Sequence, residues 1–190
     1  MSCSMIRVFI AVTPPVALQQ SFTEVRAAFQ RQAIPFRWVK HAQVHLTLKF
    51  LGNVSPEKIA SIGQAMDRAA AGQASFTLLV QSLGCFPSLS RPRVLWMGLE
   101  SHHALIQLQQ RLEAELTPLG FLPEDRPFHP HITLARMQQE GSHSQLEPLL
   151  QAYHNRQFGE ITVEQLRLFR SQLHREGAVY TILHSVILQR

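Results

Sequence analysis

A four-residue motif with one histidine and one threonine occurs twice in the 190-residue chain. The copies are His45-Leu46-Thr47-Leu48 and His131-Ile132-Thr133-Leu134, and the second begins nearly half a chain length after the first. Both copies lie in apolar stretches that are typical of β-strands. Because strand side chains alternate between two faces, each histidine shares a face with its threonine, opposite the aliphatic side chains. Each strand can therefore bury its apolar face and present one imidazole and one hydroxyl to a groove.

Two such strands, related by an approximate two-fold axis, would surround one small anion with two imidazoles and two hydroxyls. This set suits hydrolysis of a phosphodiester without a metal. A neutral histidine accepts a proton from the attacking water, and a protonated histidine donates one to the leaving oxygen. The hydroxyls of Thr47 and Thr133 can donate hydrogen bonds to the non-bridging oxygens. Spacing alone does not assign the roles of acid and base to His45 and His131.

A single His-x-Thr sequence on a strand is usually structural, so the repetition of the motif carries the argument. Two copies, each followed by leucine and each inside an apolar strand, favour one shared site over two unrelated histidines. A His-x-His pair at His129 and His131 could contribute to a metal site. No cysteine or acidic cluster completes such a site in the sequence, so we predict no metal and no cofactor.

The residues around both motifs resemble the signature blocks of the 2H phosphoesterase superfamily. These blocks are residues 45–52 and 127–136. Within the superfamily, the chain looks most like the RNA 2′,3′-cyclic phosphodiesterases, also called the 2′-5′ RNA ligase family. Further similarity lies in residues 7–11, 92–96 and 177–180, so that the resemblance covers nearly the whole chain.

The resemblance implies metal-independent hydrolysis of an RNA 2′,3′-cyclic phosphate to a 2′-phosphate. It implies that His45 protonates the departing 3′ oxygen and that His131 activates water. By microscopic reversibility, the same site could join RNA ends through a 2′-5′ linkage. The expected partner is an RNA or nucleotide with a 2′,3′-cyclic phosphate. Two other functions stay open, namely a nucleotide- or RNA-binding module without turnover and a hydrolase of another cyclic phosphate.

Arg136 is a further candidate for substrate binding, because a guanidinium suits a phosphate. Strict alternation places Arg136 opposite His131, so its approach to substrate needs the strand to end or twist there. The same alternation places Lys49 on the His45 face, where it could supply charge at the rim of the groove. Ser171 and Tyr180 are expected mainly to hold a C-terminal hairpin.

Composition is that of a soluble globular protein, with 45% hydrophobic and 16% charged residues. A formal net charge of +5 is compatible with an anionic partner. The two cysteines, Cys3 and Cys85, form no disulfide framework, and no segment has the composition of a signal peptide or a membrane span. We therefore expect a cytoplasmic protein without a membrane partner, and we expect a monomer.

Short apolar strands alternate with amphipathic helices along the chain, and some strands form hairpins. This order predicts an α+β fold with largely antiparallel sheets. The resemblance adds two pseudo-symmetric lobes, each a small antiparallel sheet backed by helices, around a central groove in one bilobal domain of residues 1–190. The expected strands are 6–12, 34–39, 44–50, 76–83, 94–99, 130–135, 161–171 and 179–188, with a turn at 175–177, and the expected helices are 16–31, 55–70, 103–119 and 145–152.

Overall fold

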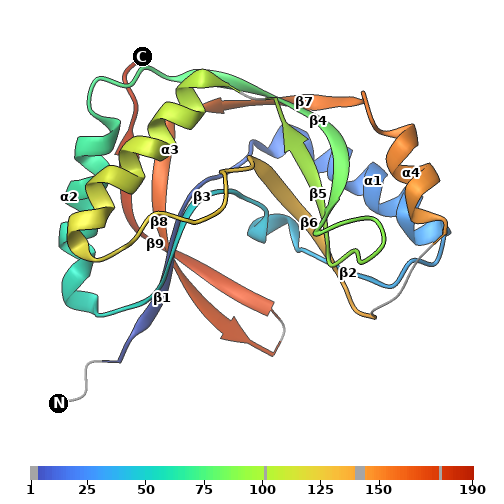
Figure 1. The fold of residues 1–190 in the computed structure, drawn as a ribbon, viewed down its shortest axis with the longest axis horizontal. Helices are drawn as coiled ribbons and strands as arrows, with labels where there is room; N and C mark the ends of the chain where they lie inside the picture. The colour runs from blue at the N-terminus through green and yellow to red at the C-terminus, as the bar shows by residue number, and fades with distance from the viewer. Residues whose placement is uncertain (1–3, 101, 140–143, 176) are drawn as a thin grey trace.

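The computed structural model describes residues 4–100, 102–139, 144–175 and 177–190, and these ranges form two lobes (Figure 1). The nine strands of the described residues pair antiparallel in the order β7-β4-β5-β6-β3-β1-β8-β9, with β2 beside β6. The predicted α+β class with two antiparallel lobes backed by helices is confirmed. The two lobes meet where β3 and β6 lie side by side.

The first lobe contains four strands and two helices. The strands are β1 (Ile6–Val12), β3 (Leu46–Val54), β8 (Gln165–His174) and β9 (Gly177–Ile187), and the helices are α2 (Ile59–Ala70) and α3 (His103–Leu116). Both helices lie together on the left of Figure 1 and cover one face of this sheet. Helix α3 turns a buried row toward the core because Leu105, Leu108, Leu112 and Leu116 recur at helical spacing.

The second lobe contains five strands and two helices. The strands are β2 (Phe36–Trp38), β4 (Phe76–Phe86), β5 (Val94–Leu99), β6 (His131–Met137) and β7 (Gln157–Val163), and the helices are α1 (Gln19–Arg31) and α4 (Leu146–Ala152). Helix α1 buries Phe22, Val25 and Phe29, and Phe29 packs against Phe36 and Trp38 of β2. The two β2 aromatics therefore contribute to packing in this lobe.

Short 3₁₀ turns flank several helices and precede β3. They are η1 (Val16–Leu18), η2 (His41–Gln43), η3 (Pro56–Lys58) and η4 (Thr117–Leu119). The helices expected at 16–31, 55–70 and 103–119 thus each include one such turn at an end. The expected turn at 175–177 contains Glu176, which lies outside the described residues.

The prediction of a single strand at 161–171 is wrong. The structure divides this stretch at Glu164, so that β7 pairs with β4 in one lobe and β8 pairs with β1 in the other. Apolar residues continue on both sides of the division, since Ile161, Val163, Leu166 and Leu168 are all buried. The sequence pattern is therefore unbroken where the chain passes from one lobe to the other.

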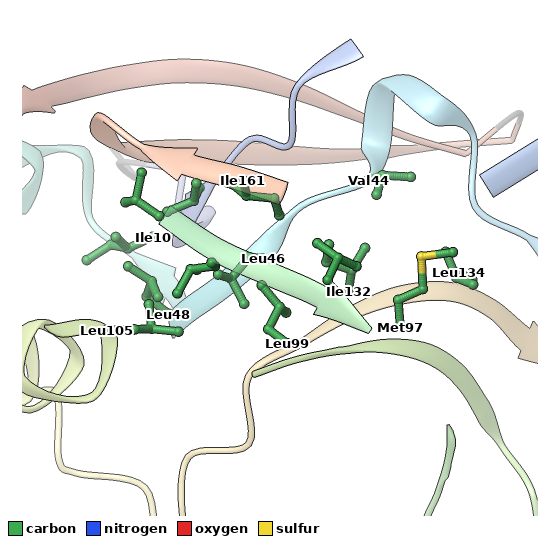
Figure 2. Close-up of a cluster of buried hydrophobic side chains, with 14 of the residues drawn as sticks. Ile10, Val44, Leu46, Leu48, Met97, Leu99, Leu105, Ile132, Leu134 and Ile161 are labelled. Atoms are coloured by element: carbon green, nitrogen blue, oxygen red, sulfur yellow. The ribbon is translucent and has the colours of Figure 1, made fainter. Parts of the chain in front are cut away.

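The main core lies between the sheet and the helices and runs through both lobes. Figure 2 shows Leu46, Leu48, Ile132 and Leu134 in one buried cluster where β3 and β6 meet. A second, smaller cluster of Phe9, Ala11 and Phe169 lies apart from this core, with Tyr180 packed against it. The first lobe therefore buries apolar side chains on both faces of its sheet.

Candidate functional site

The two histidine motifs come together through one pair of residues. Leu46 of β3 pairs with Ile132 of β6, and this is the one registered pair between the two strands within the described residues. In an antiparallel pair, the neighbours of Leu46 and Ile132 are His45 with Thr133 on one side and Thr47 with His131 on the other. Leu46 and Ile132 are fully buried, so the alternating side chains next to them face away from the core. Both histidines and both threonines thus share one face across a local two-fold axis.

Each motif strand contains a β-bulge just after its threonine. In β3 the partners on β1 shift from Ala11–Thr47 to Ile10–Lys49, which leaves Leu48 as the extra residue. In β6 the partners on β5 shift from Trp96–Thr133 to Leu95–Ala135, and Leu134 is the extra residue. A bulge of one residue exchanges the faces of all the side chains that follow it in the strand. The local two-fold axis therefore relates the bulges as well as the motifs.

The bulge in β6 corrects the expectation that Arg136 faces away from His131. Leu134 and Ala135 are both buried, and exposed Arg136 returns to the histidine face. Its charge is close enough to lower the pKa values of His45, His131 and Tyr180. The Arg136 guanidinium therefore lies on the same face as both imidazoles and acts on both through its charge.

The bulge in β3 overturns the placement of Lys49 at the rim of the groove. Lys49 is only 4% exposed, and its Nζ lies 2.7 Å from Glu113 Oε2 and 2.7 Å from the carbonyl oxygen of Leu122. Gln109 Nε2 donates to the other Glu113 oxygen at 2.9 Å. Phe50, rather than Lys49, lies on the His45 face of β3. Its side chain is 53% exposed, and its ring centroid lies 6.0 Å from that of Phe9.

Both imidazoles are oriented by the same kind of hydrogen bond. His45 Nδ1 lies 2.7 Å from the carbonyl oxygen of Gln43, and His131 Nδ1 lies 2.7 Å from that of His129. Because a carbonyl oxygen only accepts, Nδ1 carries the hydrogen in each case. The remaining nitrogen, Nε2, is therefore the one left for chemistry in both rings.

Aromatic rings enclose both histidines. His45 contacts Phe9 at 4.7 Å and Tyr180 at 5.4 Å between ring centroids, the latter edge-on. His131 contacts Phe86 edge-on at 5.0 Å and Trp96 at 6.4 Å. Each imidazole is thus held between a backbone acceptor and apolar ring surfaces.

The pKa values of both histidines lie below their ordinary value of 6.5, and burial is the main cause for each. The backbone acceptors at Gln43 and His129 act in the opposite direction. Repulsion from His131 lowers the pKa of His45 further, and repulsion from the side chain of His129 does the same to His131. Both imidazoles therefore favour their neutral forms at neutral pH.

Two residues beside His45 were not predicted from the sequence as site residues. Tyr180 was expected mainly to hold a hairpin, and Phe9 was not singled out. Tyr180 pairs with Ser171 in the β8–β9 hairpin, as expected of a structural residue, but its ring also contacts His45. Burial raises the pKa of the Tyr180 hydroxyl, so it stays protonated as a hydrogen-bond donor. Nothing in the local sequence marks Phe9, because its contact with His45 depends on the pairing of β1 with β3.

A cavity of about 900 Å³ opens at one end of the motif pair. His131 and Thr47 line it together with Phe50, Phe86 and Phe128. Within the described ranges, no three His, Cys, Asp or Glu side chains gather as a metal site would require. Among the same described residues, no helix is long and apolar enough to cross a membrane.

The chain matches the model of a known protein family. The family described as "LigT like Phosphoesterase" matches residues 12–96 and 99–180, and each stretch contains one histidine motif. An RNA 2′,3′-cyclic phosphodiesterase of Aeropyrum pernix is 34% identical over 163 residues, which are 85% of this chain and 92% of that protein. One of the same name from Thermotoga maritima is 30% identical and covers 94% of this chain and 93% of its own length.

Solved structures agree with the sequence comparison. Escherichia coli LigT complexed with 3′-AMP superimposes with a TM-score of 0.80 at 30% identity, and the match covers 98% of this chain and 99% of LigT. TT0787 of Thermus thermophilus superimposes with a TM-score of 0.77 at 30% identity, covering 97% and 98% of the two chains.

Proposed function

Since this chain belongs to the LigT-like phosphoesterase family, we propose that it hydrolyses RNA 2′,3′-cyclic phosphates to 2′-phosphates with His45 and His131 as its acid–base pair. The observation that supports this most strongly is the Leu46–Ile132 pair, which sets two His-x-Thr motifs around one point. The names of the relatives and the 3′-AMP bound to LigT favour a cyclic phosphate on a ribose.

The proposed reaction is an in-line displacement at phosphorus. Neutral His131 accepts the proton of a water molecule through Nε2, and the oxygen of that water forms a new bond to phosphorus. The bond from phosphorus to the 3′ oxygen breaks, and protonated His45 donates its Nε2 proton to that oxygen. Each such proton transfer contributes roughly 10²–10⁴-fold to the rate. The division of labour between the two imidazoles is carried over from the family resemblance.

Three further side chains stabilise the charge that gathers on the non-bridging oxygens. The hydroxyls of Thr47 and Thr133 share the histidine face and donate hydrogen bonds there. Arg136, brought to this face by the bulge in β6, supplies a permanent positive charge. An anionic phosphate between the imidazoles also raises their pKa values, so that one of them is protonated when substrate is bound.

The proposal requires no metal and no other cofactor, because protons move only between imidazoles, water and the leaving oxygen. We further propose that residues 1–190 act as one bilobal unit, as a monomer in the cytoplasm. The continuous core through both lobes supports the first of these statements. Light scattering of the purified protein and fractionation of cells that carry a tagged chain would test the other two.

The experiment that tests the proposed function is hydrolysis of nucleoside 2′,3′-cyclic phosphates, with the product phosphate located by ³¹P NMR. We expect a 2′-phosphate, unchanged rates in EDTA, and loss of at least about 10²-fold in kcat for His45→Ala and for His131→Ala. His103→Ala, which removes an exposed histidine at the start of α3, serves as the matched control. Full activity in either motif variant would refute the proposal.

A further inference from the structure

The carbonyl oxygen that orients His45 belongs to a residue whose own side chain is anchored far away in the sequence. Gln43 ends the turn η2, two residues before His45, and its carbonyl oxygen lies 2.7 Å from His45 Nδ1. The side-chain amide of Gln43 donates from Nε2 to the carbonyl oxygen of Ala178 in β9, 135 residues along the chain. One residue therefore connects the imidazole to the hairpin of β8 and β9.

The amide of Gln43 is held at both ends. Its Oε1 accepts from the backbone N–H of Lys40 at 3.4 Å, within the turn that precedes β3. At the hairpin, Gly177 begins β9 with φ = +124°, and a Cβ atom there would lie only 3.1 Å from Gln43 Nε2. The glycine thus lets the amide lie against the backbone of the strand. A side chain fixed in this way also fixes the backbone that carries it.

The same part of the hairpin reaches His45 by a second route. Tyr180 follows Ala178 by two positions, within one regular stretch of the pairing between β8 and β9. The Tyr180 ring meets the His45 ring edge-on, with 5.4 Å between the ring centroids. His45 is therefore positioned from two neighbouring points of β9, directly by Tyr180 and through the backbone of Gln43.

The second motif repeats this arrangement with different side chains. His129 stands two residues before His131, and its carbonyl oxygen lies 2.7 Å from His131 Nδ1. The His129 ring contacts Phe86 of β4 and Trp96 of β5, with 5.7 and 5.8 Å between ring centroids. In both motifs, the residue that supplies the acceptor is held by its own side chain against two paired strands of its lobe. The contact is between rings in the second motif, whereas in the first it is a single hydrogen bond.

We propose that Gln43 is a positioning residue for His45, because its amide, bound to the β8–β9 hairpin, holds its carbonyl oxygen at His45 Nδ1. A fixed acceptor keeps the hydrogen on Nδ1 and leaves Nε2 directed into the site. It also favours the protonated imidazole, since this backbone acceptor raises the pKa of His45 against the effect of burial. The consequence for catalysis rests on the proposed function, in which His45 is the acid.

The test compares two variants that each remove one hydrogen bond between distant segments. Gln43→Met keeps the length of the side chain and removes its polar atoms. Ser21→Ala is the matched control, because Ser21 Oγ donates to the carbonyl oxygen of Phe158 at 2.8 Å and joins α1 to β7. NMR titration of the Hε1 signals in the free protein measures the histidine pKa values, and the signal lost in His45→Ala assigns His45.

We expect the pKa of His45 to be lower in Gln43→Met than in the wild type, while the pKa of His131 stays unchanged as an internal reference. We expect neither value to change in Ser21→Ala. The kcat for a nucleoside 2′,3′-cyclic phosphate should fall about three- to tenfold in Gln43→Met, the order of one lost hydrogen bond, and stay constant in Ser21→Ala.

An unchanged His45 pKa in Gln43→Met would overturn the proposal, whatever the activity. A wild-type protein that does not hydrolyse the cyclic phosphate would instead refute the proposed function, because the pKa measurement needs no turnover. If Gln43→Met does not fold, Gln43→Asn provides the second variant, since its amide is one methylene too short to reach Ala178. The same lowered His45 pKa is expected there, and a wild-type value would overturn the proposal.

Discussion

Leu46 and Ile132 pair at the point where the two lobes of the sheet meet, and each lies between the histidine and the threonine of its motif. Their side chains are completely buried, while the histidine and threonine on either side of each lie at the opposite face. The packing of two aliphatic residues thus fixes the relative positions of the two imidazoles.

Substitution at Ile132 should therefore affect both stability and activity. Ile132→Ala removes buried carbons at the junction, and we expect it to lower the free energy of unfolding by roughly 2–5 kcal/mol. We also expect it to lower kcat at temperatures where the variant remains folded, because β3 and β6 are no longer held in register. Urea denaturation and steady-state kinetics on one preparation measure both effects.

Ile62→Ala is the matched control for Ile132→Ala. Ile62 is also fully buried, but it lies in helix α2, which packs mainly against α3 and β9 rather than against the motif strands. A similar loss of stability with unchanged kcat is expected here. Equal loss of kcat in both variants would show that stability alone, rather than register, limits activity.

The depressed histidine pKa values predict the pH dependence of catalysis. Burial lowers both values below 6.5 in the free protein. In the reactive form one histidine of the pair is protonated and the other is neutral. The value of kcat/KM should therefore peak below pH 6.5 and fall on the alkaline side by about tenfold per pH unit. Bound phosphate raises both pKa values, so the alkaline limb of kcat should lie at higher pH than that of kcat/KM. A kcat/KM optimum above about pH 7.5 would contradict the lowered pKa values of the two histidines in the free protein.

Removal of Arg136 should shift the same profile. The Arg136 charge lowers the pKa values of both histidines, so Arg136→Ala should move both limbs of the kcat/KM profile to higher pH. Loss of a charge-assisted contact to phosphate should also lower kcat/KM by roughly 10–100-fold at the optimum. Arg136→Lys, which keeps the charge, should leave the limbs nearly in place. If the limbs of the kcat/KM profile lie at the same pH in Arg136→Ala and in the wild type, the Arg136 charge does not act on the two imidazoles.

Lys49 should behave as a structural residue. Lys49→Met leaves the buried Glu113 carboxylate without its cation, and we expect a loss of roughly 3–5 kcal/mol in the free energy of unfolding. Lys49→Met combined with Glu113→Gln removes both charges and should recover a substantial part of that loss. Chemical denaturation of both single variants and the double variant measures the coupling. Additive effects of the two substitutions would show that the ion pair is not coupled.

The sequence predicts the positions of the motif side chains well as far as the threonines. From His45 to Thr47 and from His131 to Thr133, alternation is local and follows from strand geometry alone. After that point the prediction fails for Lys49 and Arg136, because each strand contains an extra residue. A bulge is visible only in the pairing with β1 or β5, which the local pattern of apolar residues does not reveal.

Other features of the site depend on contacts between distant segments. Tyr180 and Phe9 reach His45 because β1 pairs with both β3 and β8, and β9 pairs with β8. The division of residues 161–171 between two lobes has the same origin, since each half reads as an apolar strand by itself. Local patterns thus predict the elements, while long-range pairing determines which side chains meet.

NMR titration of both imidazoles with a nucleoside 2′-monophosphate tests most directly whether His45 and His131 act on one phosphate. We expect the Hε1 signals of both histidines to shift with one common Kd and both pKa values to rise in the complex. The His103→Ala protein supplies the assignment control and should give the same result. A shift confined to one motif histidine, or two different Kd values, would contradict a shared site.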